Sequence, residues 1–240
     1  MARCEHCGAE LRPLVVEFGG RSMELPCSEP CRCEGARRAR EDAEAREQER
    51  RGREQAERRA RRARKAGIPE RYLDAASNYA RRAWSLVEQG RGLYIVGGVG
   101  CGKTQLACGV LGCALDAGRR VKFASAPAIF SAIRSTYNGG GSEEEVVGCF
   151  LRPDVLVIDD LGMETPTEWT LMQLFRIVDE RYSQRRPLVV TTQFDYDALA
   201  ARLARRGDEA TARAILSRLR GSCGRIAISG GDLRCESADR

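Results

Sequence analysis

The residues best suited to chemistry form a glycine-rich loop that ends in a lysine and a threonine. The segment GGVGCGKT, residues 97–104, matches the pattern G-x-x-x-x-G-K-[ST] in full. Its glycines let backbone N–H groups point at phosphate oxygens, and the following helix adds partial positive charge. Lys103 can then reach the β- and γ-phosphates, and the Thr104 hydroxyl can bind Mg²⁺. The predicted ATP-binding residues are Gly97, Gly98, Val99, Gly100, Cys101, Gly102, Lys103, Thr104 and Gln105.

Two aspartates follow a second apolar run, in LRPDVLVIDDLG. We assign Asp159 to Mg²⁺ and Asp160 to activation of the attacking water. An ordinary strand-end charge is the alternative for Asp160. An aspartate is one methylene shorter than the glutamate that many ATPases use, so we expect slow hydrolysis. Gln193 follows another apolar run and is a candidate to sense the γ-phosphate or orient water; a plain loop residue is the alternative.

Cysteines are concentrated at the start of the chain, where five of the eleven lie within 33 residues. Cys4 and Cys7 form a C-x-x-C pair, and Cys27, Cys31 and Cys33 follow. Five thiols offer a four-coordinate zinc site, but spacing alone does not say which two of the later three complete it. His6 is expected to be a bystander. We interpret the scattered cysteines as packing residues, namely Cys101, Cys108, Cys113, Cys149, Cys223 and Cys235.

Short apolar runs alternate with amphipathic stretches after residue 67, which is typical of β-α-β units around a parallel sheet. A helix over 103–117 should follow the glycine-rich loop and end at Gly118. A second helix should begin with a capping box at Thr165 and with Pro166 as its first residue. We therefore expect an α/β fold. The predicted strands are 93–97, 121–125, 155–159, 188–192 and 225–229.

The segment 35–65 carries thirteen basic and seven acidic residues, which accounts for the whole-chain net charge of +6. It has no large apolar residue, and it has Glu/Arg pairs at the i, i+4 spacing that supports a solvated helix. It is a charged helical linker or, alternatively, a phosphate-contacting arm. The expected domains are 1–34, 35–66 and 67–240. No apolar run of about 18 residues and no secretory signal is found, so we expect a soluble cytoplasmic protein.

Six motifs in order resemble the DnaC-like and IstB-like branch of AAA+ ATPases, which includes bacterial helicase loaders and transposition helper proteins. The motifs are AGIPERY, GGVGCGKTQLA, IDDLG, DERY followed by PLVVTTQFD, ILSRL and GDLR. The resemblance covers residues 67–234. It implies a P-loop NTPase (RecA-like AAA+) core with a parallel five-stranded sheet flanked by helices. Because only six residues follow Arg234, we expect no C-terminal lid domain.

The resemblance also implies roles for single residues. Gln193 occupies the sensor-1 place, where the family usually has asparagine. Arg218 resembles the arginine finger that reaches a neighbouring subunit's ATP, which implies a homo-oligomer, and Arg234 resembles the sensor-2 arginine. An ordinary surface arginine is the alternative for both. The similar arrangement ending in C-x-C-E favours Cys31 and Cys33 as zinc ligands.

The stretch APAIFSAIRSTYNGGG resembles the extra helix that initiator-type members use to touch single-stranded DNA. Arg134 and Tyr137 are the predicted DNA contacts, because an arginine attracts phosphate and an aromatic ring stacks on bases. Ile129, Phe130 and Ile133 are predicted to be core. Simple helix packing is the alternative for the whole stretch.

The resemblance implies an ATPase that loads a replicative DNA helicase onto single-stranded DNA, with ATP, Mg²⁺ and Zn²⁺ as cofactors and the zinc module gripping the helicase. One alternative is a transposition helper that binds duplex DNA and recruits a transposase. Another is an adaptor that binds ATP without hydrolysing it.

Overall fold

The computed structural model describes residues 2–18, 20–139, 141–205 and 208–231. By its internal contacts the chain divides into two compact units, Met1–Arg58 and Arg59–Arg240. Helix α1 (Glu34–Lys65) contributes to both. The finer domain boundaries expected at residues 34 and 66 stay a prediction. Among the described residues, no helix has both the length and the apolar character needed to cross a bilayer.

The first unit contains one antiparallel hairpin, formed by β1 (Pro13–Phe18) and β2 (Arg21–Ser28). Val16 pairs with Met23 across the two strands, and both side chains are exposed. A lone two-stranded hairpin is marginally stable in water, because it has little apolar surface to bury. The unit therefore needs a further source of stability.

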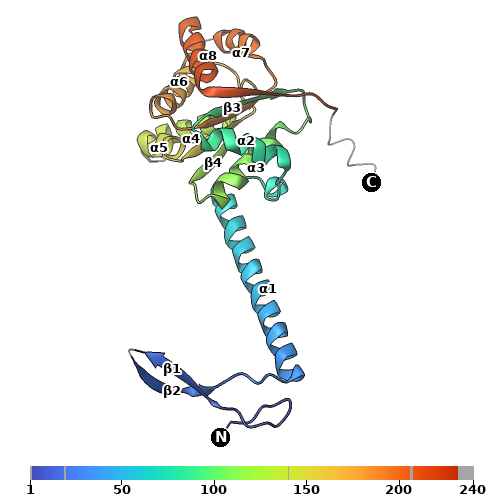
Figure 1. Cartoon of the computed structure of the whole chain (residues 1–240). Helices are drawn as coiled ribbons and strands as arrows, with labels where there is room; N and C mark the ends of the chain where they lie inside the picture. Colours follow the sequence, from blue (N-terminus) through green and yellow to red (C-terminus); the bar gives the residue numbers. More distant parts are fainter. Residues whose placement is uncertain (1, 19, 140, 206–207, 232–240) are drawn as a thin grey trace. The chain divides into compact units, whose positions relative to one another are not determined.

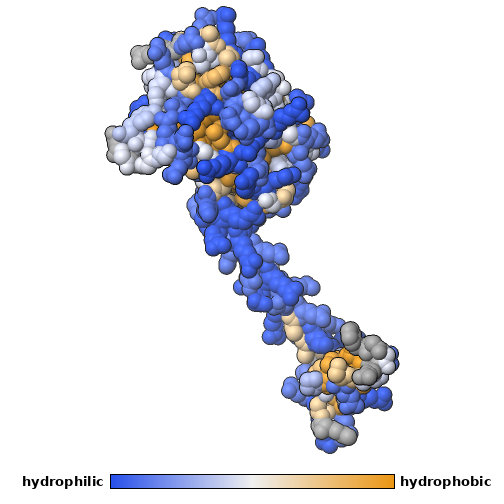
Figure 2. Space-filling view, turned by 90° about the vertical axis from the view of Figure 1, so that its left-hand side faces the viewer, coloured by the Kyte–Doolittle hydropathy of each residue, from blue (hydrophilic) through white to orange (hydrophobic). Residues whose placement is uncertain are grey.

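The highly charged segment is helical, as predicted. Two of the predicted ion pairs form along α1, Glu47–Arg51 at 2.7 Å and Glu49–Arg53 at 2.6 Å. Arg50 bridges Glu47 and Glu54 at 2.8 and 2.7 Å. Figure 2 shows the exposed part of this helix as almost entirely hydrophilic. Since each exposed pair of this kind contributes little, the helix is supported by several weak pairs together.

The second unit is built on a five-stranded parallel sheet in the order β4-β5-β6-β3-β7, which confirms the predicted α/β class (Figure 1). The strand bounds fall within about two residues of the expected ones. They are β3 Gly92–Gly97, β4 Val121–Ser125, β5 Val155–Asp159, β6 Leu188–Thr192 and β7 Cys223–Ile228.

Alternate residues of each strand enter two separate cores. Leu93 and Ile95 of β3 face a core shared with α2 (Asn78–Glu88) and α3 (Lys103–Asp116). Tyr94 and Val96 face the other core, whose helices are α4 (Ala126–Ser135), α5 (Glu143–Leu151), α6 (Glu168–Ser183), α7 (Tyr196–Ala204) and α8 (Glu209–Ser222). Covering both faces explains why the strands read as continuous apolar runs rather than alternating ones.

One helix start differs from the prediction. The N-cap of α6 is Thr167, and Thr165 and Pro166 precede the helix. The Thr167 hydroxyl accepts from the Thr170 amide at 3.1 Å, and the Thr170 hydroxyl accepts from the Thr167 amide at 2.8 Å. Thr170 thus takes the place of the Glu or Gln that usually completes a capping box. The capping box is present, but it begins two residues later than expected.

A buried arginine joins α6 to the loop before β5. Arg181 is 1% exposed, and its guanidinium donates to the carbonyl oxygens of Phe150, Pro153 and Pro187 at 3.0, 3.0 and 2.7 Å. Burial lowers the pKa of Arg181 to about 9. The DERY sequence that carries this arginine therefore fixes the C-terminal end of α5 and the start of β6 relative to each other.

Candidate nucleotide and zinc sites

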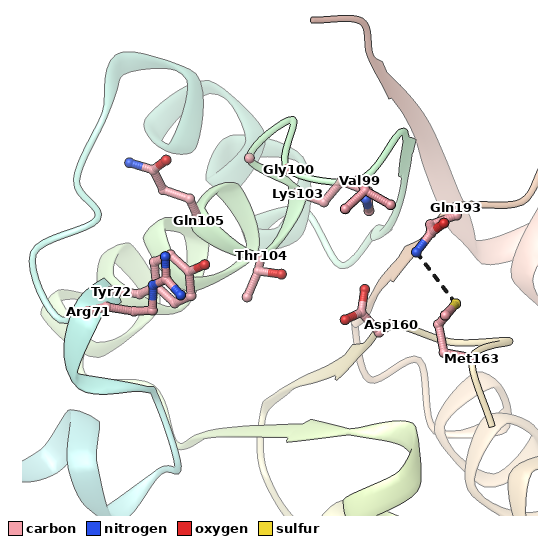
Figure 3. A pocket seen from close by; sticks show the side chains of 11 residues that line it. Arg71, Tyr72, Val99, Gly100, Lys103, Thr104, Gln105, Asp160, Met163 and Gln193 are labelled. Carbon is pink, nitrogen blue, oxygen red and sulfur yellow. Dashed lines mark hydrogen bonds between the residues drawn. The ribbon is translucent and has the colours of Figure 1, made fainter. Parts of the chain in front are cut away.

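A cavity of about 400 Å³ opens at the carboxyl ends of the central strands (Figure 3). Such edges of parallel sheets are where ligands bind in α/β proteins. Its lining comes from the glycine-rich loop, from the loops after β5 and β6, and from a segment before α2. The lining residues are Arg71, Tyr72, Val99, Gly100, Gly102, Lys103, Thr104, Gln105, Asp160, Met163 and Gln193.

The loop before α3 has the backbone shape that phosphate binding requires. Gly100 and Gly102 have φ of 73° and 93°, a region that glycine adopts without strain. A Cβ on Gly97 would lie 2.5 Å from the Ile228 carbonyl oxygen, so the loop also needs glycine where it leaves β3. Gly97, Gly98 and Cys101 are in the loop but do not line the cavity, and Cys101 is buried as a packing residue.

Lys103 begins α3 and is 6% exposed, with its Nζ donating to the Gly98 carbonyl oxygen at 2.6 Å. This contact folds the side chain back along its own loop. Lys103 and Thr104 are consecutive residues at the start of α3, and both line the cavity (Figure 3). The arrangement suits an anionic group with several oxygens.

Thr104 and Asp159 lie together, although they are 55 residues apart in the chain. The Thr104 hydroxyl is 3.0 Å from Asp159 Oδ1 and 3.2 Å from Oδ2. The Thr191 hydroxyl of β6 donates to Asp159 Oδ1 at 2.6 Å. A hydroxyl beside a carboxylate is the hard oxygen donor set that Mg²⁺ prefers, so these residues fit a magnesium ion. Burial raises the pKa of Asp159, and a cation would favour its charged form.

Asp160 is held in an unusual backbone conformation. Its φ is 54°, which few non-glycine residues adopt, and its amide donates to the Thr191 hydroxyl at 2.9 Å. Asp160 lines the cavity (Figure 3), whereas Asp159 is buried and is not among the lining residues. Gln193 lies on the same side of the cavity, with its Nε2 3.5 Å from Met163 Sδ. The structure thus brings together both members of the aspartate pair and Gln193.

Several functional positions were not identified from the sequence. Arg71 and Tyr72 line the cavity from η1 (Glu70–Tyr72), and the Arg71 guanidinium lies 5.1 Å from the centre of the Tyr72 ring. Thr191 contacts both aspartates. The AGIPERY segment, which contains Arg71 and Tyr72, was the available signal for the first two.

The predicted arginine finger, Arg218, is paired within its own chain. Arg218 on α8 pairs through Nε with Asp179 of α6, and its guanidinium lies 4.8 Å from the centre of the Phe175 ring. Its side chain is 28% exposed. Arg218 does not line the nucleotide cavity of its own chain, and its role toward a neighbouring subunit stays a prediction. Arg234, the predicted sensor-2 residue, lies outside the described residues.

The predicted DNA contacts lie on α4 and on η2 (Thr136–Asn138) and are exposed. The Arg134 guanidinium lies 4.9 Å from the centre of the Trp169 ring. The Tyr137 hydroxyl accepts from Trp169 Nε1 at 2.9 Å and donates to Glu143 at 2.7 Å. Ile129, Phe130 and Ile133 are buried, as predicted. The two candidate residues therefore belong to one surface network rather than standing alone.

Four cysteines of the first unit form a compact thiol cluster. The Sγ atoms of Cys4, Cys7, Cys31 and Cys33 all lie within 4.8 Å of one another, with Cys4–Cys33 at 3.8 Å and Cys7–Cys31 at 3.6 Å. A tetrahedral zinc with bonds of about 2.3 Å requires sulfur atoms about 3.8 Å apart. The donor set therefore fits zinc. Cys27, on β2, is exposed and outside the cluster.

The thiols of the cluster compete for protons. The amides of His6 and Cys7 lower the pKa of Cys4 to about 6. The Ala9 amide lowers the pKa of Cys7, but hydrogen bonds with the Cys31, Cys4 and Cys33 thiols outweigh it and raise that pKa to about 12. Thiols in such a cluster can all be ionised only when a cation lies beside them. Zinc ligands must be ionised thiolates, so the cluster matches what zinc binding requires.

Comparison with known proteins agrees with this geometry. The replicative helicase loader DnaC of Escherichia coli K12 is 32% identical over 108 residues, which cover 45% of this chain and 44% of that protein. The putative insertion sequence ATP-binding protein y4pL of Sinorhizobium fredii is 30% identical over 165 residues, 69% of this chain and 65% of that protein. The chain thus spans less than half the length of the DnaC protein that it matches.

Solved structures share the fold of the second unit. The crystal structure of the DnaC helicase loader matches with a TM-score of 0.56 at 23% identity, over 67% of this chain and 100% of that one. The crystal structure of DnaI matches with a TM-score of 0.54 at 26% identity, over 63% and 81%. The model of the family described as IstB-like ATP binding protein matches residues 53–239. Because this match spans most of the chain, the protein belongs to the IstB-like ATP-binding protein family.

Proposed function

We propose that this protein is an ATPase that loads a replicative DNA helicase onto single-stranded DNA. The observation that carries the proposal is the convergence of Lys103, the Thr104–Asp159 pair, Asp160 and Gln193 on one cavity. The similarity to DnaC, a replicative helicase loader, and the shared fold of DnaC and DnaI support the same assignment.

The residues of the cavity divide the work of ATP hydrolysis. The loop amides and Lys103 bind the phosphates, and Thr104 and Asp159 hold Mg²⁺. When bound, this ion neutralises charge on the β- and γ-phosphates. Asp160 accepts a proton from the attacking water, and Gln193 orients that water by a hydrogen bond. Arg71 and Tyr72, which Figure 3 shows across Thr104 from Asp160, are placed to contact the remainder of the nucleotide.

Hydrolysis would be completed between subunits. In this proposal, ATP-dependent assembly frees Arg218 from Asp179 so that it reaches the γ-phosphate of a neighbouring subunit, where a positive charge stabilises the transition state. Arg134 and Tyr137 contact single-stranded DNA, and the thiol cluster, with zinc bound, folds the unit that grips the helicase.

Arg218→Ala is expected to reduce the turnover of assembled protein by about a thousandfold, while MgATP affinity stays within about twofold of the native value. The reason is that Arg218 lies outside its own nucleotide cavity. Phosphate release and ATP binding would be measured on the same samples. Arg220→Ala is the matched control, since Arg220 lies on the same helix and also pairs with an aspartate, Asp197. Equal hydrolysis by native protein and Arg218→Ala would contradict the assignment.

The loading function is tested by ATP-dependent association. The protein would be mixed with the replicative helicase of its own host and single-stranded DNA, with MgATP or MgADP. We expect a ternary complex with MgATP that releases the loader after hydrolysis, measured by size-exclusion chromatography with light scattering. If MgATP promotes no association with either helicase or single-stranded DNA, this function is wrong even though ATP is bound.

The match to y4pL and to the IstB-like family supports a second candidate, a transposition helper that binds duplex DNA and recruits a transposase. Preference for duplex DNA in a binding competition, together with ATP-dependent assembly along it, would favour this candidate. Equal phosphate release from native protein, Lys103→Ala and Arg218→Ala would instead favour an adaptor that binds ATP without hydrolysing it.

A further inference from the structure

A second cavity, of about 530 Å³, lies between α4 and the start of α6. Pro127 and Phe130 give it apolar surface, and Ser131, Thr165 and Thr167 contribute hydroxyl groups. Arg134 lines it as well. An apolar body with a polar rim suits a flat heteroaromatic ring, which presents faces to pack and edges to hydrogen-bond.

One buried carboxylate, that of Glu164, belongs to the lining of this cavity, and one of its two oxygens has no hydrogen-bond partner among the described residues. Glu164 is 8% exposed, and its Oε2 accepts from the Gly162 amide at 2.9 Å. Its Oε1 is buried and has no partner among the described residues. An unsatisfied buried acceptor costs free energy, which a ligand with an N–H group can recover. Glu164 is the only acidic residue in the described lining, so a metal ion would find too few ligands.

The arginine of this cavity is fixed in place by an aromatic ring. Arg134 lies over Trp169, whose Nε1 is hydrogen-bonded to the Tyr137 hydroxyl. The guanidinium is thereby held at the cavity wall, where it can contact phosphate or stack on a base. The positive end of α6, a helix of 16 residues, lies at the same cavity and also favours a phosphate nearby.

The cavity adjoins the nucleotide site through consecutive residues of one loop. Met163 lines the nucleotide cavity and contacts Gln193, while Glu164 lines the second cavity. The Gly162 amide that binds Glu164 belongs to the same loop, two residues after Asp160. A ligand that engages Glu164 therefore acts on the segment that carries Asp160 and Met163.

We propose that this second cavity holds one unstacked base of single-stranded DNA and that Glu164 accepts a hydrogen bond from the base's exocyclic amino group. The proposal rests on the DNA-binding part of the function proposed above and adds to it a base preference. Cytosine offers an amino group where thymine offers a carbonyl oxygen, which a carboxylate repels. The site therefore favours cytosine over thymine.

The native protein is expected to bind an oligo-dC strand about tenfold more tightly than an oligo-dT strand of equal length, since a hydrogen bond to a charged group is involved. Binding would be measured by fluorescence anisotropy with a non-hydrolysable MgATP analogue. Because burial raises the pKa of Glu164, the buffer is set at about pH 8, well above the usual pKa of a glutamate. Glu164→Gln keeps an acceptor for the Gly162 amide and replaces Oε1 by an NH₂ donor. The variant is therefore expected to lose the preference for dC or reverse it toward dT.

Glu168→Gln is the matched control. Glu168 is the first residue of α6, is exposed and does not line the cavity, so this substitution removes the same charge outside the cavity. It should keep the native preference. Equal affinity of native protein for dC and dT, or a folded Glu164→Gln with the native preference, would overturn the inference while leaving the loading function intact. If no single-stranded DNA binds at all, both proposals fail. The affinities of native protein for oligo-dC and oligo-dT can be compared without any variant. The test therefore stands even if Glu164→Gln folds poorly.

Discussion

Lys103→Ala is expected to weaken MgATP binding by roughly a hundredfold and to reduce phosphate release to background. The Lys103 side chain is buried at the start of α3. In the variant, water can therefore replace only part of the interaction between the ammonium group and the phosphate oxygens. Truncating one partner of a buried, hydrogen-bonded charge pair costs about 2–5 kcal/mol, which corresponds to a factor of about 30 or more in affinity. Titration calorimetry with native and variant protein measures the change directly.

Lys122→Ala provides the control for this variant, since Lys122 lies on β4 and does not line the nucleotide cavity. It should bind MgATP as native protein does. The proposed cavity would be the wrong one if Lys103→Ala retained native affinity, or if both lysine variants lost it equally. MgATP at a concentration that saturates native protein should also raise the melting temperature of native and Lys122→Ala protein much more than that of Lys103→Ala.

Removal of zinc is expected to unfold the first unit. Its hairpin has exposed apolar side chains at Val15, Val16 and Met23 and little core of its own, whereas a structural zinc supplies about 10–16 kcal/mol in zinc-finger peptides. Cys31→Ser, or treatment with a strong chelator, should reduce the zinc content from one ion per chain to none. The backbone amides of β1 and β2 should then lose their protection against hydrogen exchange. Exchange measured by mass spectrometry also reports the second unit, whose strands should stay protected.

Cys27→Ser gives a close comparison, because Cys27 is a cysteine of the same unit that lies outside the thiol cluster. We expect it to retain the metal and the protected hairpin. Loss of zinc from Cys27→Ser but not from Cys31→Ser would reverse the ligand assignment. A hairpin equally protected with and without metal would show that the cluster does not stabilise the unit.

The lining of the nucleotide cavity illustrates what spacing can and cannot predict. The glycine-rich loop, Lys103 and Thr104 are neighbours in the chain, so a local motif is enough to identify them. No local motif singles out Thr191, although it contacts both Asp159 and Asp160. Its role depends on the placement of β6 between β3 and β5, and no local pattern encodes strand order.

The arginines give a second comparison. The SRL motif identified Arg218, but its pairing with Asp179 depends on how α8 packs against α6, 39 residues earlier in the chain. Arg181 enters the sequence analysis only as part of the DERY motif. The structure buries it, because five backbone carbonyl groups around its guanidinium replace water. Charge alone therefore did not distinguish a surface arginine from one that joins elements in the core.

The sequence by itself determined the strands, the phosphate-binding loop, the charged helix and the supply of thiols, because hydrophobic period, glycine placement and residue type act over a few neighbouring positions. Only the tertiary structure decided which thiols meet, which side chains orient Asp159 and Asp160, and that Met163 and Glu164 line two different cavities. These relations depend on the packing of segments far apart in the chain. Hydrogen bonds between such segments require positions set to within a few tenths of an ångström, and only the folded core fixes them.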